Sequence, residues 1–422
     1  MDKTKIILVT LLSLLALLCI GCIEDSTVNA KTTINAESVE DYDIAAANNA
    51  FAFDMYSMVK NNDENVFFSP YSIFTAMAIC YDGAEGSTKE QMANVFYYPL
   101  SKPILEGSSK EMIDAINSDN AAYDLETANA LWVLDEYPLN EQYAFNAKNY
   151  YDGMVTPLNF IGEPEKSADT INTWIAEKTN DKIKDLIPKN GIDSNTRLVI
   201  TNTVYFNGKW VYEFEEPATR ERSFTLSNGE EKLVDTMYNV QKFNYGDDQK
   251  AKILELPYKG NDLCMYIVLP KEKNIAAFED EFSFKYYNKL KADMQTKHYV
   301  KTLIPKFKFN TGAELKPHLI EMGVVDAFNP SSANFTGIFD IKELPEGSLS
   351  ISEVYHQAFI GVNEKGTEAT AATAVVMEEE GAPDSPWEFE ANHPFLFIIE
   401  DKRTGCILFM GKVEDPEYEE MS

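Results

Sequence analysis

A run of small residues at 366–377 has the alternation of a β-strand but little of the bulk that a core strand carries. The residues on one face are small at the start and apolar at the end: Thr367, Ala369, Ala371, Thr373, Val375 and Met377. No proline occurs between Gly366 and Pro383, so every residue there keeps the N–H group that a sheet ladder needs, and Gly366 supplies the dihedral freedom of a hinge. The segment predicts a strand that can enter between two strands that are already formed.

The residues that follow, at 378–386, read EEEGAPDSP, a charged and turn-rich sequence. This composition is typical of an exposed loop tip, where proteases cut most readily. A strand that can move is therefore followed directly by a segment that can be cleaved.

Four further motifs accompany this segment: NVFFSPYSI at 65–73, TNTVYFNGKW at 201–210, NHPFLF at 392–397 and GKVEDP at 411–416. Together they make the chain resemble the serpins, the serine protease inhibitor superfamily, over one continuous domain at 43–416. The resemblance implies an α+β fold with three mixed or antiparallel β-sheets and about eight to nine helices. It also implies an exposed reactive-centre loop at about 364–390 and no cofactor, metal or catalytic activity.

In inhibitory serpins the cleaved bond lies about sixteen residues beyond the hinge glutamate, here Glu364, so the resemblance places it between Glu380 and Gly381. The neighbouring Glu378 and Glu379 are chemically equivalent to Glu380, so a shifted bond is the alternative. A carboxylate at the cleaved bond favours a protease with a basic or polar pocket. We expect a glutamyl endopeptidase, with aspartate-preferring or cysteine proteases behind it. The implied hinge residues are Glu364, Gly366, Thr367, Ala369, Ala371 and Ala372.

The resemblance also implies a shutter, a buried polar network below the place where the main sheet opens, formed by Ser69, Ser72, Asn202 and His356. His356 falls among apolar alternates in EVYHQAFIGV at 353–362, which by itself predicts only a buried histidine satisfied by a polar neighbour. Each unpaired member of such a network costs about 1–3 kcal/mol, so the network can favour one sheet arrangement over another.

Three residues would lie at the breach, the end of the sheet where the loop first enters. Trp210 is one of them, although without the resemblance it reads only as a core aromatic. Lys306 and Glu364 resemble the family's ion pair at this end. As surface ions they would contribute about 0–1 kcal/mol, so we expect them to act through position more than stability.

The N-terminus has the order of an export signal, in which two lysines precede an apolar run at 6–18 that is too short for a comfortable membrane span. The run ends in CIGC, which resembles a prokaryotic lipoprotein box with Cys22 as the lipid acceptor, although Cys19 stands where an aliphatic residue is usual. A C-x-x-C redox motif is the alternative, but it lacks a thioredoxin-like context. We expect a signal peptide at 1–22, a flexible tether at 23–42, and an extracellular protein anchored to the outer face of the cell membrane through Cys22.

Acidic residues outnumber basic residues by 68 to 37, giving a formal net charge of −31. Nucleic acid is thereby excluded as a partner class, because its binding depends on lysine and arginine side chains. The stretch at 108–117, where some serpins carry a basic helix for glycosaminoglycans, has one lysine beside two acids and predicts no such activation. Cys80, Cys264 and Cys406 lie in apolar surroundings and predict buried free thiols in a monomer. An acidic tail follows at 417–422.

Periodicity predicts helices at 44–60, 69–96 and 163–178, the last with Ile171, Trp174 and Ile175 on one face. By resemblance, this last helix lies across the main sheet and must yield when the loop enters. Strands are predicted at 123–134, 196–206, 253–257 and 263–269. Two apolar runs at 394–399 and 406–413, joined by a turn, predict a final hairpin buried on both faces.

Sequence motifs of hydrolases, zinc proteases and nucleotide-binding enzymes are missing. The four histidines, His298, His318, His356 and His393, show no spacing that favours a Ser-His-Asp triad. The resemblance implies a suicide-type inhibitor, which traps a serine or cysteine protease as an acyl-enzyme while the cut loop inserts into the main sheet. The alternative is a non-inhibitory serpin acting as a carrier, chaperone or structural surface lipoprotein; the small hinge residues favour inhibition. An exported hydrolase is a remote third reading.

Overall fold

The computed structural model describes residues 41–61, 63–117, 122–340, 349–367 and 386–418, all within the compact unit Thr33–Ser422. Several predictions fall outside these residues. They are the signal peptide at 1–22 with Cys22, nearly all of the tether, most of the acidic tail, the hinge residues Ala369, Ala371 and Ala372, and the Glu380–Gly381 bond.

Nine α-helices occur among the described residues. They are α2 (Ile44–Val59), α3 (Pro70–Gly83), α4 (Gly86–Phe96), α5 (Lys102–Ile116), α6 (Glu141–Tyr151), α7 (Pro164–Lys178), α8 (Ala276–Glu281), α9 (Phe284–Ala292) and α10 (Lys316–Met322). The single helix predicted at 69–96 is wrong, because Ala84 and Glu85 are extended and Gly86 has a φ of +57°. The N–H group of Glu85 instead donates to the carbonyl of Asn334, 3.0 Å away.

Six strands form one mixed sheet, in the order β10 (Phe307–Glu314), β11 (Ile351–Asn363), β12 (Gly366–Thr367), β4 (Leu198–Lys209), β2 (Tyr123–Leu134) and β3 (Gly153–Leu158). Direct pairing of β11 with β4 also occurs, along the part of the sheet that β12 does not reach. We call this sheet the main sheet, and it contains the predicted strand at 123–134 with unchanged bounds.

The second sheet has nine strands. Its order is β1 (Val66–Phe68), β15 (Ile407–Val413), β14 (Phe395–Asp401), β8 (Leu263–Pro270), β7 (Ala251–Pro257), β6 (Glu231–Asp247), β9 (Gln295–Pro305) and β13 (Trp387–Glu390), with β5 (Arg220–Thr225) also paired to β6. The long strand β6 pairs with β7 near one end and with β5 at the other, so it joins two sections. These two sections and the main sheet correspond to the three sheets expected, and the predicted α+β fold is confirmed.

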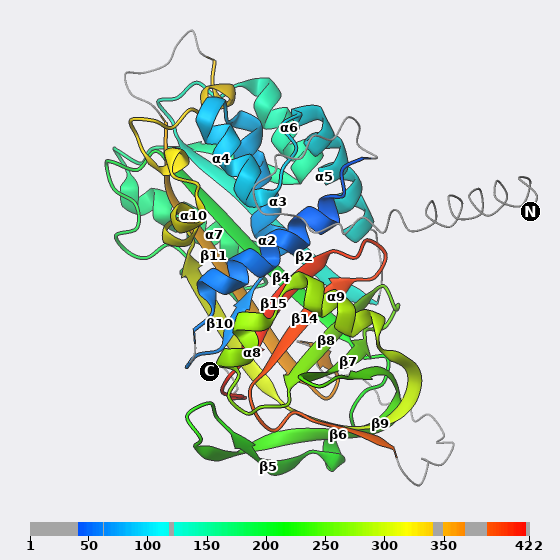
Figure 1. Ribbon diagram of the computed structural model, residues 1–422. Coiled ribbons are helices and arrows are strands. Elements are labelled where there is room, and N and C mark those ends of the chain that lie inside the picture. Colours follow the sequence, from blue (N-terminus) through cyan, green and yellow to red (C-terminus); the bar gives the residue numbers. More distant parts are fainter. Residues whose placement is uncertain (1–40, 62, 118–121, 341–348, 368–385, 419–422) are drawn as a thin grey trace, which may run out of the picture. The chain divides into compact units, whose positions relative to one another are not determined.

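One hydrophobic core joins the facing sides of the two sheets to the packed helices α2 to α6. Helices α2 to α6 gather toward one end of the fold, whereas β5, β6 and β9 lie toward the other (Figure 1). Between the sheets, the ring of Phe206 on β4 lies 5.9 Å from that of Phe409 on β15, and the rings of Phe307 and Phe397 lie 5.5 Å apart. Aromatic side chains therefore hold the main sheet against the second sheet.

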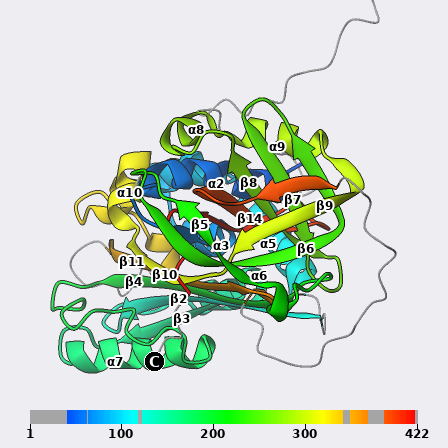
Figure 2. The same ribbon diagram turned by 90° about the horizontal axis from the view of Figure 1, so that it is seen from below.

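Helix α7 lies on the other face of the main sheet, away from α2 and α3 (Figure 2). As predicted, Ile171 and Ile175 are buried, and the ring of Trp174 meets that of Trp132 on β2 edge to face at 5.5 Å. The helix therefore covers the sheet near the strands that must separate if another strand is to enter.

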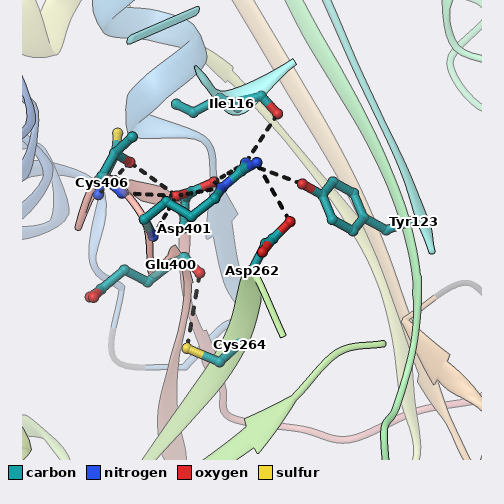
Figure 3. A network of polar contacts seen from close by, with 9 residues as sticks. Ile116, Tyr123, Asp262, Cys264, Glu400, Asp401 and Cys406 are labelled. Carbon is teal, nitrogen blue, oxygen red and sulfur yellow. Dashed lines mark hydrogen bonds and ion pairs between the residues drawn. The ribbon is translucent and has the colours of Figure 1, made fainter. Parts of the chain in front are cut away.

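The final hairpin of β14 and β15 is buried along both strands, as predicted. Its turn is organised by the buried carboxylate of Asp401, which accepts the backbone N–H groups of Arg403 and Thr404 (Figure 3). Arg403 in turn donates to the carboxylate of Asp401, the carbonyl of Ile116 and the hydroxyl of Tyr123. Arg403, paired with the buried Asp401, thus ties the hairpin to the end of α5 and the start of β2.

Candidate functional site

In the middle of the main sheet β11 and β4 pair with each other, and at one end of the sheet they are separated. Strands β11 and β4 pair directly in parallel, from the Ile351–Leu198 pair to the Ala358–Val204 pair. Beyond that point β12 stands between them, with Thr367 opposite Val362 on one side and Gly208 on the other. Gly366 and Thr367 therefore already lie between β11 and β4.

Gly366 is required at this position by a close approach of two strands. A β-carbon added to Gly366 would lie 2.0 Å from the carbonyl oxygen of Gly208, a distance that no real side chain adopts. The sequence suggested conformational freedom as the role of Gly366, and the structure adds a steric reason.

The breach ion pair of Glu364 and Lys306 is present, with 3.3 Å between the carboxylate and the ammonium. The expectation of surface ions is wrong, because the two side chains are only 7% and 18% exposed. Thr219 donates a further hydrogen bond of 2.8 Å to the Glu364 carboxylate, and the N–H group of Phe214 donates to the Glu364 carbonyl. The segment that precedes β5 thus covers the pair, so removing one partner would leave a poorly solvated charge.

Trp210 lies at the open end of the sheet, where the resemblance placed it. Its side chain is buried, its indole N–H donates to the carbonyl of Asn363 at 3.0 Å, and its backbone N–H donates to the carbonyl of Lys365 at 2.9 Å. The ring also stacks on that of Tyr258, 4.6 Å away. Trp210 therefore holds the segment from which the loop starts.

A row of three buried polar residues crosses the main sheet below the opening. His356 on β11 is opposite Asn202 on β4, which is opposite Asn129 on β2. The Nδ1 atom of His356 lies 2.6 Å from the side-chain oxygen of Asn202, and the amide nitrogen of Asn202 donates to the side-chain oxygen of Asn129. This polar row links β11, β4 and β2 at one level of the sheet.

Two serines at the start of α3 meet this row. Ser69 caps the helix, accepting the N–H group of Ser72 at 3.2 Å, while its own hydroxyl donates to the carbonyl of Leu408. The hydroxyl of Ser72 accepts a hydrogen bond from Asn202. All four residues predicted for the shutter are therefore brought together. Asn129 was missed, because its position opposite Asn202 depends on the register between strands.

His356 is neutral in this network. Its Nε2 atom accepts the backbone N–H group of Ser69 at 3.2 Å, so the proton resides on Nδ1, which donates to Asn202. Complete burial disfavours the charged ring and lowers the pKa of His356 to about 3. A proton on Nε2 would also break the hydrogen bond from Ser69.

A family model for Serpin (serine protease inhibitor) matches residues 46–416. An uncharacterised serpin-like protein of Methanosarcina acetivorans is 68% identical over the full length of both chains. This chain is a serpin. Membership in the family supports a protease-inhibitor type of function in general, because serpins are generally protease inhibitors and not catalysts.

Solved serpin structures resemble this serpin closely. Uncleaved ovalbumin superimposes with a TM-score of 0.81 at 30% identity, covering 89% of this chain and 100% of its own. Human thyroxine-binding globulin complexed with thyroxine gives a TM-score of 0.80 at 25% identity, covering 89% and 99%. The similarity spans the whole serpin fold.

Two of this serpin's four histidines are engaged in contacts other than those of a catalytic triad. The two nitrogens of His356 are occupied by Asn202 and the backbone of Ser69, and those of His393 by Asn392 and the carbonyl of Pro270. The structure describes no cluster of three or more histidine, cysteine, aspartate or glutamate side chains suited to a metal ion. Nor does any helix in its described part have the length and apolarity to span a membrane. Cys80, Cys264 and Cys406 are buried free thiols, as predicted.

Proposed function

We propose that this serpin is a suicide-type protease inhibitor that traps its target as a covalent acyl-enzyme by inserting the cleaved reactive-centre loop into the main sheet. The observation that carries the proposal is the pairing at the sheet opening. Strands β4 and β11 are parallel neighbours, and β12 is antiparallel to both. A strand that continues from β12 replaces one parallel ladder with two antiparallel ladders, which are slightly more stable per residue.

The free energy available from this exchange is large. Once inserted, residues 367–378 would form a strand of about 12 residues, or about 40 Å at roughly 3.3 Å per residue. Each new ladder hydrogen bond contributes on the order of 1 kcal/mol, and burial of Val375 and Met377 adds to this sum. The total exceeds about 10 kcal/mol, which is comparable to the whole stability of an ordinary protease domain.

The chemistry of the trap belongs to the protease. Its nucleophile attacks the carbonyl carbon of Glu380, the bond to Gly381 breaks, and the new amine of Gly381 leaves with a proton while the acyl-enzyme remains. Loop insertion then competes with hydrolysis of that ester. A glutamate at the cleaved bond favours a glutamyl endopeptidase as the target. This serpin supplies no catalytic group, and its action comes from conformational energy.

Anchoring at the cell surface through Cys22, a monomeric state and independence from glycosaminoglycans belong to the same proposal. Lys110, the one lysine of the stretch at 108–117, is paired with Asp114 at 2.8 Å, which leaves this part of α5 little free positive charge. Mass spectrometry of the N-terminal peptide from membranes tests the anchor: a mass without lipid on Cys22 excludes it.

A carrier or other non-inhibitory role is the second candidate. Thyroxine-binding globulin has the same fold and was solved with thyroxine bound, so the serpin fold is compatible with a role other than inhibition. The small residues Ala369, Thr370, Ala371 and Ala372 favour inhibition, because bulky or charged residues on the inner face would impede insertion.

A panel of proteases that includes a glutamyl endopeptidase tests the proposal. We expect an SDS-resistant complex with that enzyme and a released C-terminal fragment that begins at Gly381. Thr367→Arg places a charge on the inserting face and is expected to abolish the complex while cleavage continues. Thr370→Arg, on the opposite face by alternation, is the matched control and should retain it. Complete turnover of the wild-type protein as a plain substrate would contradict inhibition.

A further inference from the structure

The side chain of Tyr258, which follows β7, reaches the first rung of the opening. Its ring is completely buried, stacks on Trp210 and meets Phe206 edge to face at 4.9 Å. A β-carbon at Gly208 would lie 2.9 Å from this ring, so the glycine leaves the space that the ring occupies. Trp210 and Phe206 thus hold the ring against Gly208, the residue of β4 that pairs with Thr367.

The hydroxyl group of Tyr258 lies 2.6 Å from that of Thr367, and the two share a hydrogen bond. Thr367 is itself only 2% exposed, so neither hydroxyl has ready access to water. On the inserting face, alanines follow at 369 and 371, and the next hydroxyl occurs at Thr373. On the first half of the inserting face, only Thr367 can therefore satisfy Tyr258.

We propose that Tyr258 is a positioning residue that sets the register in which the loop enters the main sheet. A slip of one residue brings Gly366 or Glu368 opposite Gly208 and turns the inserting face outward. A slip of two residues brings Ala369 there, and the Tyr258 hydroxyl is left buried without its partner. The unsatisfied hydroxyl disfavours the slipped register by about 5- to 150-fold. This inference rests on the proposed function of loop insertion.

The first test needs no protease. In the intact protein, hydrogen exchange measured on peptides covering 361–367 reports how firmly β12 is held. Tyr258→Phe and Thr367→Val each remove one hydroxyl with little change in shape. We expect exchange of this peptide to rise about 3- to 10-fold in either variant, and no further in the double variant, because both remove the same bond.

The second test measures loop insertion. With a protease that forms the complex, both variants should raise the number of inhibitor molecules consumed per protease trapped, while the rate of the first cleavage stays unchanged. Tyr143→Phe is the matched control, since it also removes a buried tyrosine hydroxyl, one that donates to the carbonyl of Ile79 in the helical region. Tyr143→Phe should lower the free energy of unfolding without changing the exchange of the 361–367 peptides or the number of inhibitor molecules consumed per protease trapped.

The two tests separate the inference from the function on which it rests. If wild-type protein forms no complex with any protease, inhibition fails, yet the exchange experiment still reports whether Tyr258 holds the register. Unchanged exchange in both single variants, or additive effects in the double variant, overturns the positioning role. Should Tyr258→Phe fail to fold, Thr367→Val alone carries the comparison, because the loop residue has no part in the core of the second sheet.

Discussion

At the scale of single residues, the main finding is a neutral histidine held inside a polar row. His356 could be predicted as buried because it alternates with apolar residues, and its partners Asn202, Ser69 and Ser72 followed from motif resemblance. Asn129 could not be predicted, because nothing local distinguishes it from any other strand asparagine. It becomes part of the network only when antiparallel pairing places β2 beside β4.

The depressed pKa of His356 predicts acid sensitivity. Since the folded pKa of about 3 lies below the ordinary value of 6.5, the unfolded chain binds this proton first as pH falls. The free energy of unfolding should therefore decrease below pH 6.5 by about 1.4 kcal/mol per pH unit from this group.

Denaturant unfolding of wild type and His356→Gln between pH 7 and pH 4.5 checks this slope. The variant should be less stable at pH 7 but should lose less stability on acidification. His393 also has a pKa lowered by burial, so part of the slope will remain in the variant. Parallel pH profiles for the two proteins would show that His356 does not titrate in this way.

At the scale of elements, periodicity located α7 and β2 well because each has one clear apolar pattern. The break between α3 and α4 was missed, although glycines at 83 and 86 stand on either side of the extended residues Ala84 and Glu85. There the chain leaves the helix to bond Asn334, a residue some 250 positions away in sequence. Local pattern thus predicts an element's existence more securely than its end.

Helix α7 offers a prediction at this scale. Because Trp174 packs on Trp132, Trp174→Ala should loosen α7 from β2 and speed the entry of a strand into the main sheet. A synthetic peptide of residues 367–378 provides that strand, and its uptake is followed by native electrophoresis. We expect several-fold faster uptake and a less stable intact protein.

Phe145→Ala is the matched control, since it removes a large aromatic ring from α6 that is 55% exposed. Uptake at the wild-type rate in Trp174→Ala would mean that α7 does not limit opening of the sheet.

At the scale of the whole molecule, the main sheet has an arrangement of strands whose free energy an inserted strand can lower. Directly paired β4 and β11 are parallel, whereas their pairing with β12 is antiparallel. We therefore expect the protein cleaved at its loop to be far more stable than the intact protein. With more than about 10 kcal/mol gained, the melting temperature should rise by at least about 10 °C.

Differential scanning calorimetry of both forms, at the same pH and concentration, makes the comparison. The control is protein cleaved in the presence of excess 367–378 peptide, which occupies the opening first and should leave cleavage without effect on melting. A cleaved protein that melts no higher than the intact form contradicts loop insertion itself.

The sequence alone determined the family, the α+β class and most residues of the shutter. Those features reside in local order: alternation, turn-forming residues and short motifs. Only the tertiary structure decided that Glu364 and Lys306 are covered, that Asn129 completes the polar row, and that Tyr258 meets Thr367 across a gap left by Gly208. The physical reason is that burial and register arise from segments far apart in the chain, whose mutual position no local pattern specifies.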